Sequence, residues 1–188
     1  MPDLAHLIQL TTVPVQNHDV RLLLAKYLED NHVGMTFEQL VAQASSDIRE
    51  DFGRNVLPGG KFFVAEAAYA AARDVHLPKL RQVFRDYFSK TGVAAIVFPA
   101  TMVPPTPIGQ DTEVVIAGKK VTFETAVARN IAPGSTVGLP GLVLPAGLTH
   151  EGLPVALEFD GPAGSDRRLL SLGLSLERTL GHLPSPQL

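Results

Sequence analysis

The sequence contains no cysteine, and it has no large surplus of charge of either sign. Without cysteine, disulfide frameworks and reactions that need a thiolate are excluded. The 16 lysines and arginines stand against 19 aspartates and glutamates, for a formal net charge of -3. Proteins that bind nucleic acid usually present a basic face or stripe, so we expect no nucleic-acid partner.

Long apolar runs are missing as well. No window approaches the ~18 uninterrupted apolar residues that a membrane-spanning helix needs. The first residues, MPDLAHLIQLTT, carry Asp3 and lack the basic flank of a secretory signal peptide. We therefore expect a cytoplasmic protein without a membrane partner, and the absence of cysteine fits a reducing compartment.

Proline and glycine are plentiful, and their distribution divides the chain. Many of the 15 prolines and 16 glycines lie after residue 98. Before them, residues 17–92 show helical periodicity, as in DVRLLLAKYLED. Thr36 followed by Gln39 is a capping-box pattern that predicts a helix start. An alanine-rich stretch over about 62–75 predicts a long helix.

Pro78 marks the expected start of the next helix, because the first turn of a helix tolerates the missing N–H of proline. Beyond Gly92, short apolar runs predict strands at 94–98, 141–146 and 155–159. Near-continuous apolar strands indicate a sheet that is covered on both faces. A hairpin around Gly118 and a last helix from about Ser165 complete the second half.

These elements predict the α/β fold class and a single domain over 1–188. Its first part, 1–92, should be mainly helical, and its second part, 93–188, should combine strands with helices. Few strands are visible, and a sheet with open edges pairs readily with other strands. We therefore expect further strands outside this sequence, or a homo-oligomer formed through the exposed sheet edge.

Side chains that carry out catalysis are hard to find. No serine lies in a G-x-S-x-G elbow. The histidines have no spacing typical of a zinc site, so we expect no metal. Gly59-Gly60-Lys61 lacks the remaining residues of a phosphate-binding loop, and no dinucleotide fingerprint is present, so we expect no cofactor. The acidic pairs Glu29-Asp30 and Glu50-Asp51 are typical of solvated helix faces.

The segment 129–147, RNIAPGSTVGLPGLVLPAG, is unusual in composition. It contains three prolines and four glycines around a short apolar strand. Glycine allows positive φ and close backbone approach, and loops at strand ends often build functional sites. From the residues alone, a Gly/Pro loop that forms a pocket wall and a tight packing corner are both open.

Three stretches carry a family resemblance: FPATMVPPTPIG at 98–109, the segment 129–148, and GLPVALEFDGPAGSDRRLLSLGLSLE at 152–177. In this order and spacing they resemble the C-terminal portion of the amidase signature family. The resemblance implies the C-terminal part of an α/β/α sandwich, whose mixed β-sheet is covered by helices. Within the family, the chain is most similar to the hydrolases of indoleacetamide and of mandelamide, which convert small aryl-substituted amides to acid and ammonia.

The resemblance also implies that the catalytic residues are absent from this sequence. The Lys–Ser–Ser triad of the family lies in its N-terminal half. None of the lysines outside the first helix matches the catalytic position; these are Lys61, Lys79, Lys90, Lys119 and Lys120. We therefore expect no catalytic residue here and a chain that is inactive by itself. The alternatives are a self-associating binding or scaffold protein, and one subunit of a split amidase.

The resemblance further implies one wall of a pocket for a small-molecule amide, if the N-terminal half completes it. The expected substrate-binding residues lie at strand ends and in the Gly/Pro loop: Thr101, Asn130, Ser135, Thr136 and Gly138. Alternatively, all five only shape loops. Two positions depart from the family pattern: Ala100 replaces a frequent threonine, and Thr136 replaces a frequent asparagine.

Overall fold

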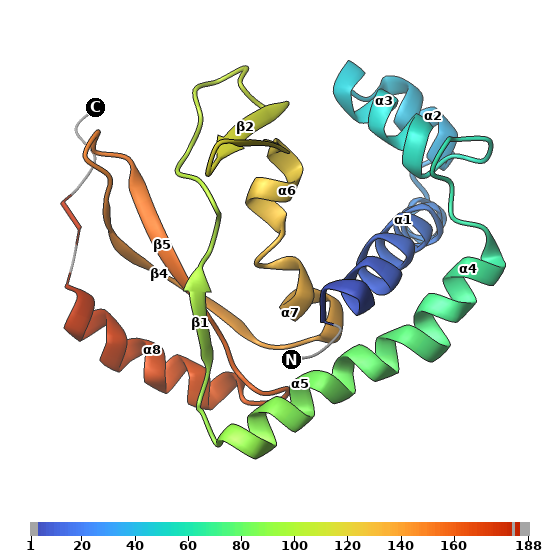
Figure 1. Ribbon diagram of the computed structural model, residues 1–188. Helices are drawn as coiled ribbons and strands as arrows, with labels where there is room; N and C mark the ends of the chain where they lie inside the picture. Colours follow the sequence, from blue (N-terminus) through green and yellow to red (C-terminus); the bar gives the residue numbers. More distant parts are fainter. Residues whose placement is uncertain (1–3, 182, 185–188) are drawn as a thin grey trace. The chain divides into compact units, whose positions relative to one another are not determined.

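The computed structural model describes residues 4–181 and 183–184 (Figure 1). The ends of the expected 1–188 domain, residues 1–3 and 185–188, lie outside the described residues, as does residue 182. The chain divides into two compact units, which we call the first unit (1–82) and the second unit (83–188). The boundary falls inside helix α5 (Leu77–Thr91).

The first unit is helical, in agreement with the periodicity of its sequence. Its elements are α1 (Leu4–Asp30), α2 (Phe37–Gln43), α3 (Ser46–Asn55), α4 (Glu66–Ala71) and the π-helical segment η1 (Ala72–His76). Helix α1 begins well before residue 17 and contains Pro14 in its interior. The helical pattern at 17–30 therefore marks only the second half of this helix.

The capping box that the sequence predicts is present at the start of α2. The Thr36 hydroxyl accepts the Gln39 N–H at 3.2 Å, and the Gln39 side chain accepts the Thr36 N–H at 2.9 Å. The cap directs Phe37 and Val41 into a core that also contains Val56. Residues of α1 and α3 pack on this core, so a local signal and an apolar cluster support the same helix.

The expected helix start at Pro78 agrees with α5, which begins at Leu77, but no break precedes it, because α4, η1 and α5 follow one another without interruption. In the π-helical turn, the Leu77 N–H donates to the Ala72 carbonyl oxygen, five residues back. Proline lacks an N–H, and its ring clashes with the carbonyl four residues earlier in a regular α-helix. A widened π turn just before Pro78 relieves this conflict, so the helix continues.

In the second unit, the strands β1 (Ile96–Pro99), β4 (Gly141–Leu148) and β5 (Pro154–Asp160) form one antiparallel sheet in the order β1-β5-β4. The strands β2 (Glu113–Ile116) and β3 (Lys119–Thr122) form a separate hairpin, as predicted. Its turn residues Ala117 and Gly118 have φ of 50° and 77°, the conformation of a two-residue hairpin turn. The predicted α/β class is confirmed.

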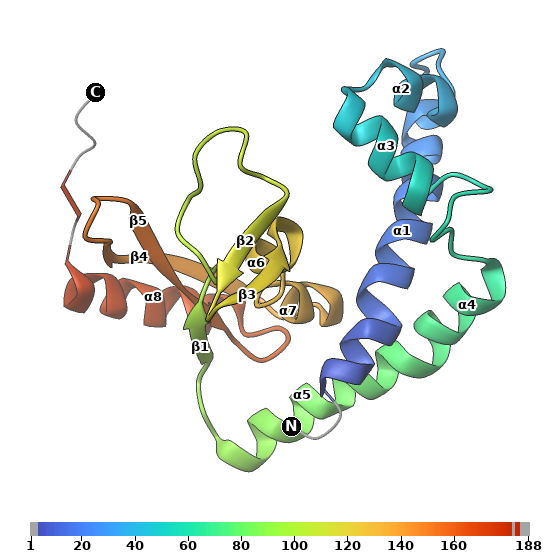
Figure 2. The ribbon, with the colours of Figure 1, turned by 45° about the horizontal axis from the view of Figure 1, so that its top comes forward.

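Three helices accompany the sheet: α6 (Phe123–Ala128), α7 (Ala132–Val137) and α8 (Asp166–Leu180). Figure 2 shows α8 running along the sheet formed by β4 and β5. Leu144, Phe159 and Leu169 form the buried core between this sheet face and α8. Successive side chains of a strand point to opposite faces, so the neighbours of Phe159 on β5 point away from α8.

The Gly/Pro segment 129–147 is more regular than the expected loop. It contains α7 and most of β4. Pro133 occupies the first turn of α7, and Gly138, with φ of 78°, ends the helix in the left-handed conformation. Pro133 and Gly138, two of the residues that suggested a loop, therefore mark the two ends of a short helix.

Candidate functional site

A groove of about 340 Å³ lies at the carboxyl end of β1. Its walls are mostly apolar and come from the segment 99–105, from Phe123 and Val127 of α6, and from the start of β5 at 154–156. Pockets for small molecules are typically apolar with a few placed polar groups. In this groove, the Thr101 hydroxyl is the one side-chain hydroxyl among the described lining residues.

Backbone hydrogen bonds fix the segment that forms one wall of the groove. The Ala100 N–H donates to the Ala156 carbonyl oxygen at 3.1 Å, which extends the sheet beyond β1. The Met102 N–H donates to the Ala126 carbonyl oxygen at 2.9 Å, which ties the segment to α6. The Thr101 hydroxyl donates to the Val103 carbonyl oxygen at 2.6 Å. These bonds therefore connect the wall segment to β5 through Ala156 and to α6 through Ala126.

Asn130, the second expected substrate-binding residue, is connected to the same groove. Its side-chain N–H donates to the Pro99 carbonyl oxygen at 2.9 Å, and Pro99 lines the groove. The bond joins the turn between α6 and α7 to the end of β1. Thr101 and Asn130 thus lie at the same groove, although no histidine, lysine or carboxylate is among the described residues that line it.

The three other expected residues lie on α7 and do not line this groove. Ser135 is exposed, and the Thr136 hydroxyl donates to the Ala132 carbonyl oxygen at 2.8 Å. Gly138 is the C-terminal cap of the helix. Their assignment to a substrate pocket stays a prediction.

Sequence reasoning missed a pair of buried acids, Glu158 and Asp160 of β5. Only 8% of Glu158 and 4% of Asp160 is exposed. Burial, followed by the charge of Glu158 and a hydrogen bond with it, raises the pKa of Asp160 to about 7. Burial also raises the pKa of Glu158. The signal was available: two acids at alternate positions in the apolar strand LPVALEFDG share one face.

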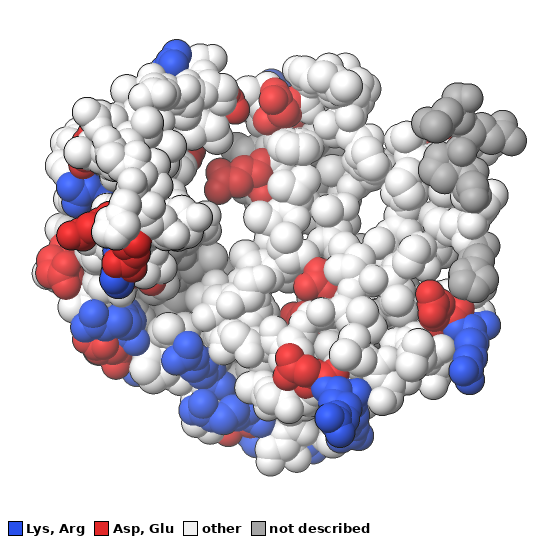
Figure 3. All heavy atoms as spheres, turned by 180° about the vertical axis from the view of Figure 1, so that it is seen from behind, with Lys and Arg blue, Asp and Glu red and all other residues white. Residues whose placement is uncertain are grey.

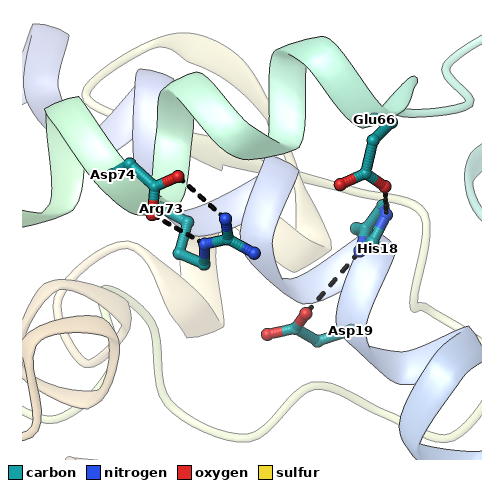
Figure 4. A network of polar contacts seen from close by, with 5 residues as sticks. All are labelled: His18, Asp19, Glu66, Arg73 and Asp74. Atoms are coloured by element: carbon teal, nitrogen blue, oxygen red, sulfur yellow. Dashed lines mark hydrogen bonds and ion pairs between the residues drawn. The ribbon is translucent and has the colours of Figure 1, made fainter.

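A second cluster of ionisable side chains lies in the first unit, between α1 and the α4–η1 helix (Figure 4). His18 Nε2 lies 3.1 Å from a carboxylate oxygen of Glu66, and its ring stacks on Tyr69 with centroids 3.6 Å apart. Arg73 and Asp74 form a two-bond pair at 2.7 and 2.8 Å. The side chains of Glu66, Arg73 and Asp74 are 76%, 49% and 57% exposed, so this network lies at the surface, with the His18 side chain largely buried at 12%.

No group of three or more His, Cys, Asp or Glu suited to hold a metal ion is found within residues 4–181 and 183–184. The same residues form no helix that is long and apolar enough to cross a membrane. On the face drawn in Figure 3, basic and acidic side chains are interspersed, without a large area of one sign.

Comparison with known proteins connects this chain to one family. The family model described as Amidase matches residues 1–170. The indoleacetamide hydrolase of Agrobacterium vitis is 34% identical over 187 residues, which are 98% of this chain and 40% of that protein. The mandelamide hydrolase of Pseudomonas putida is 36% identical over 196 residues, which are 99% of this chain and 37% of that protein. The chain thus spans about 40% of the length of these relatives, and it matches their C-terminal portion.

The relatives also include one component of a larger enzyme. This glutamyl-tRNA(Gln) amidotransferase subunit of Roseobacter denitrificans is 32% identical over 135 residues, covering 72% of this chain and 25% of that protein. Among solved structures, a crystal structure of an amidase is 28% identical with a TM-score of 0.66, covering 93% of this chain and 37% of that chain. The peptide amidase of Stenotrophomonas maltophilia shares the fold, with a TM-score of 0.63 at 16% identity. The match covers 99% of this chain and 36% of that chain.

Proposed function

The chain belongs to the amidase family, and we propose that it forms the C-terminal part of an enzyme that hydrolyses a small, aryl-substituted carboxamide to a carboxylic acid and ammonia. One observation carries the proposal. Two relatives that match almost the whole chain at 34% and 36% identity are named as hydrolases of indoleacetamide and mandelamide. Both names describe an amide that carries an aromatic group.

We assign to this chain the role of a pocket wall. The groove at the end of β1 has about 340 Å³ and mainly apolar walls, which suits an aromatic ring. Thr101 lies in it, and Asn130 holds its Pro99 edge. We also propose that Ser135, Thr136 and Gly138, at α7 and its C-terminal cap, face the substrate once the remaining part of the enzyme is present.

The chemistry itself requires groups that this chain does not offer at the groove. Hydrolysis of an amide needs a nucleophile with a base beside it, and donors for the oxyanion. The Thr101 hydroxyl hydrogen is engaged by the Val103 carbonyl oxygen, and no histidine, lysine or carboxylate is among the described residues that line the groove. We therefore propose that the chain by itself does not turn over an amide, and that a Lys–Ser–Ser triad outside it does.

A chimera tests this function. The C-terminal portion of the Pseudomonas putida mandelamide hydrolase is replaced by this chain at the boundary of the match, and release of ammonia from mandelamide and indoleacetamide is measured. We expect the chimera to hydrolyse at least one of the two amides. A matched chimera with Thr101→Val should show a changed KM and a kcat that changes less, because Thr101 contacts bound substrate and not the reacting serine.

The isolated chain is assayed beside the chimera under the same conditions. We expect no turnover from the chain alone. Robust hydrolysis by the isolated chain, or a correctly folded chimera without activity toward any aryl amide, contradicts the proposal.

A second candidate is that the chain serves as one component of a split amidase. It is supported by the relative from Roseobacter denitrificans, which is itself one component of an amidotransferase. The sheet also supports it, because β1 and β4 each have a single strand neighbour among the described residues. A strand with one free edge can pair with another chain. Light scattering after size-exclusion chromatography separates the cases: a stable dimer of the chain alone favours self-association, and a complex formed only with an amidase-like partner favours the split enzyme.

A further inference from the structure

The buried acids of β5 are the feature that the proposed function leaves unexplained. Glu158 and Asp160 are two residues apart, so both point to the sheet face opposite the one that packs on α8. Exposed fractions of 8% and 4% place both carboxyl groups almost out of contact with water. An isolated charge in such a place is costly unless a partner or a proton compensates it.

Within the described residues, neither acid forms an ion pair with a lysine, arginine or histidine. Phe98 and Val143 stand opposite Glu158 on β1 and β4, and Ile96 and Gly141 stand opposite Asp160. The sequences of β1 (IVFP), β4 (GLVLPAGL) and α7 (APGSTV) contain no lysine, arginine or histidine, and no further acid. Arg129, at the end of α6, forms no ion pair with either carboxyl group within the described part of the chain.

Two glycines bring the backbone directly against the carboxyl groups. A Cβ at Gly134 of α7 would collide with the Asp160 carboxyl group. A Cβ at Gly141 of β4 would lie 3.1 Å from an oxygen of Asp160 and 3.1 Å from an oxygen of Glu158. Helix α7 therefore rests on Asp160 through a position that has no side chain, and β4 approaches both acids at Gly141.

We propose that Glu158 and Asp160 share one proton, and that this hydrogen-bonded pair forms the seat on which α7 is held. Asp160 donates the shared proton to a carboxylate oxygen of Glu158, so only one negative charge is buried. The pair acts as a set of positioning residues for Ser135 and Thr136. Their place in the substrate pocket rests on the proposed function, whereas the shared proton and the seat do not.

The proton makes the seat sensitive to pH. The pKa of Asp160, raised to about 7 in the folded chain, falls back to about 4 when unfolding exposes the group to water. Between these values the folded state holds a proton that the unfolded state has released. The contribution of the pair to stability is therefore greatest at low pH and is lost as pH rises through 7, because a second negative charge then forms beside Glu158.

Unfolding of this chain by urea at pH 5 and pH 8 tests the shared proton. The midpoint of the wild-type chain should be clearly lower at pH 8 than at pH 5. Asp160→Asn keeps the shape and a donor to Glu158 but cannot ionise, so this difference should shrink to less than half. The matched control Asp111→Asn removes an exposed acid and should retain the full difference. Equal pH dependence in wild type and Asp160→Asn overturns the proposal.

A direct titration covers the case in which Asp160→Asn does not fold. The side-chain carboxyl carbons of the wild-type chain are followed by NMR from pH 4 to pH 9. We expect one buried carboxyl to change with a midpoint near 7 while its neighbour is already ionised. Two independent midpoints below 5 contradict a shared proton.

Hydrogen exchange tests the seat itself. Protection factors of the α7 amides should fall between pH 5 and pH 8 in the wild-type chain, while those of α2 in the first unit stay constant. In Asp160→Asn, the protection of α7 should not depend on pH. Uniform behaviour of α7 and α2 contradicts the seat. None of these measurements involves amide hydrolysis, so an inactive chimera and a failed seat are distinguishable.

Discussion

In the first unit, ionisable side chains meet at the surface between α1 and the α4–η1 helix, whereas in the second unit they meet beneath α7. At the surface, His18 lies against Glu66 and Arg73 pairs with Asp74, and the Glu66, Arg73 and Asp74 side chains are in contact with water. Beneath α7, two buried acids lie together, and neither forms an ion pair within the described part of the chain. Water and salt weaken the first arrangement, and a proton is required for the second.

The contribution of a charged cluster thus depends on its surroundings more than on the number of its contacts. The surface network has several short contacts and still should contribute little, because exposed pairs exchange protein contacts for similar contacts with water. The acid pair has few partners, but it supports the backbone of α7 at Gly134. Substitutions in the second unit should therefore have larger effects than substitutions in the first unit.

We expect the largest loss of stability from Gly134→Ala. The new methyl group would collide with the carboxyl group of Asp160, a residue that is only 4% exposed. We expect a loss of about 1–3 kcal/mol in the free energy of unfolding, the usual range for overpacking. Urea unfolding followed by circular dichroism measures it. A loss within experimental error would show that α7 is not seated on the acids.

A smaller effect is expected from Thr36→Ala in the first unit. The substitution removes the hydroxyl that accepts the Gln39 N–H at 3.2 Å, and with it half of the capping box. We expect a loss of about 1 kcal/mol in the free energy of unfolding, typical for an N-cap. Thr36→Ser keeps the acceptor and is the matched control. If both variants lose equally, the methyl group matters and the cap does not.

We expect Gly53→Ala to increase the free energy of unfolding, in contrast to the same substitution at Gly134. A Cβ at Gly53 in α3 would have no atom within 4 Å, so the methyl group meets no obstacle. Alanine restricts the unfolded chain and favours the helix, for a gain of about 0.5–1 kcal/mol. The unfolding midpoint is the measurement. Destabilisation by Gly53→Ala would contradict the open surroundings of α3 and weaken the contrast with α7.

We expect the smallest change in stability from Glu66→Gln. It removes the negative charge beside His18 but keeps a side-chain oxygen that can accept a hydrogen bond, and the Glu66 side chain is 76% exposed. We expect a change of less than about 0.5 kcal/mol at neutral pH, which added salt reduces further. Unfolding with and without salt checks this. A loss as large as that of Gly134→Ala would show that the surface network holds the first unit together, contrary to the expected order of effects.

Local signals account for the parts of the fold that were predicted. The capping box at Thr36, the hairpin at Gly118 and the apolar strands of the second unit all depend on residues that are close in the chain. The expected helix start at Pro78 is present, but a π-helical turn joins it to the preceding helix and accommodates a proline that would interrupt a regular helix. The Gly/Pro segment was expected as a loop, because short helices leave little periodicity to detect.

The candidate site likewise contains residues that were expected from the sequence and residues that were not. Thr101 and Asn130 follow from the family resemblance; Thr101 lines the groove, and Asn130 is bonded to its Pro99 edge. The acid pair was visible as alternate acids in LPVALEFDG, yet its surroundings were not. Burial depends on which elements pack on β5, and no pattern within the strand contains that information.

The α/β class, the membership of the amidase family and the order of most helices and strands could all be read from the amino-acid sequence, since composition, periodicity and motif spacing are local properties. The packing of the folded chain was needed to establish that Gly134 rests on Asp160, that Asn130 holds the end of β1, and that two acids are buried side by side in β5. The physical reason is that electrostatic energy depends on the solvent and the charges around a group, and these are set when distant segments pack together.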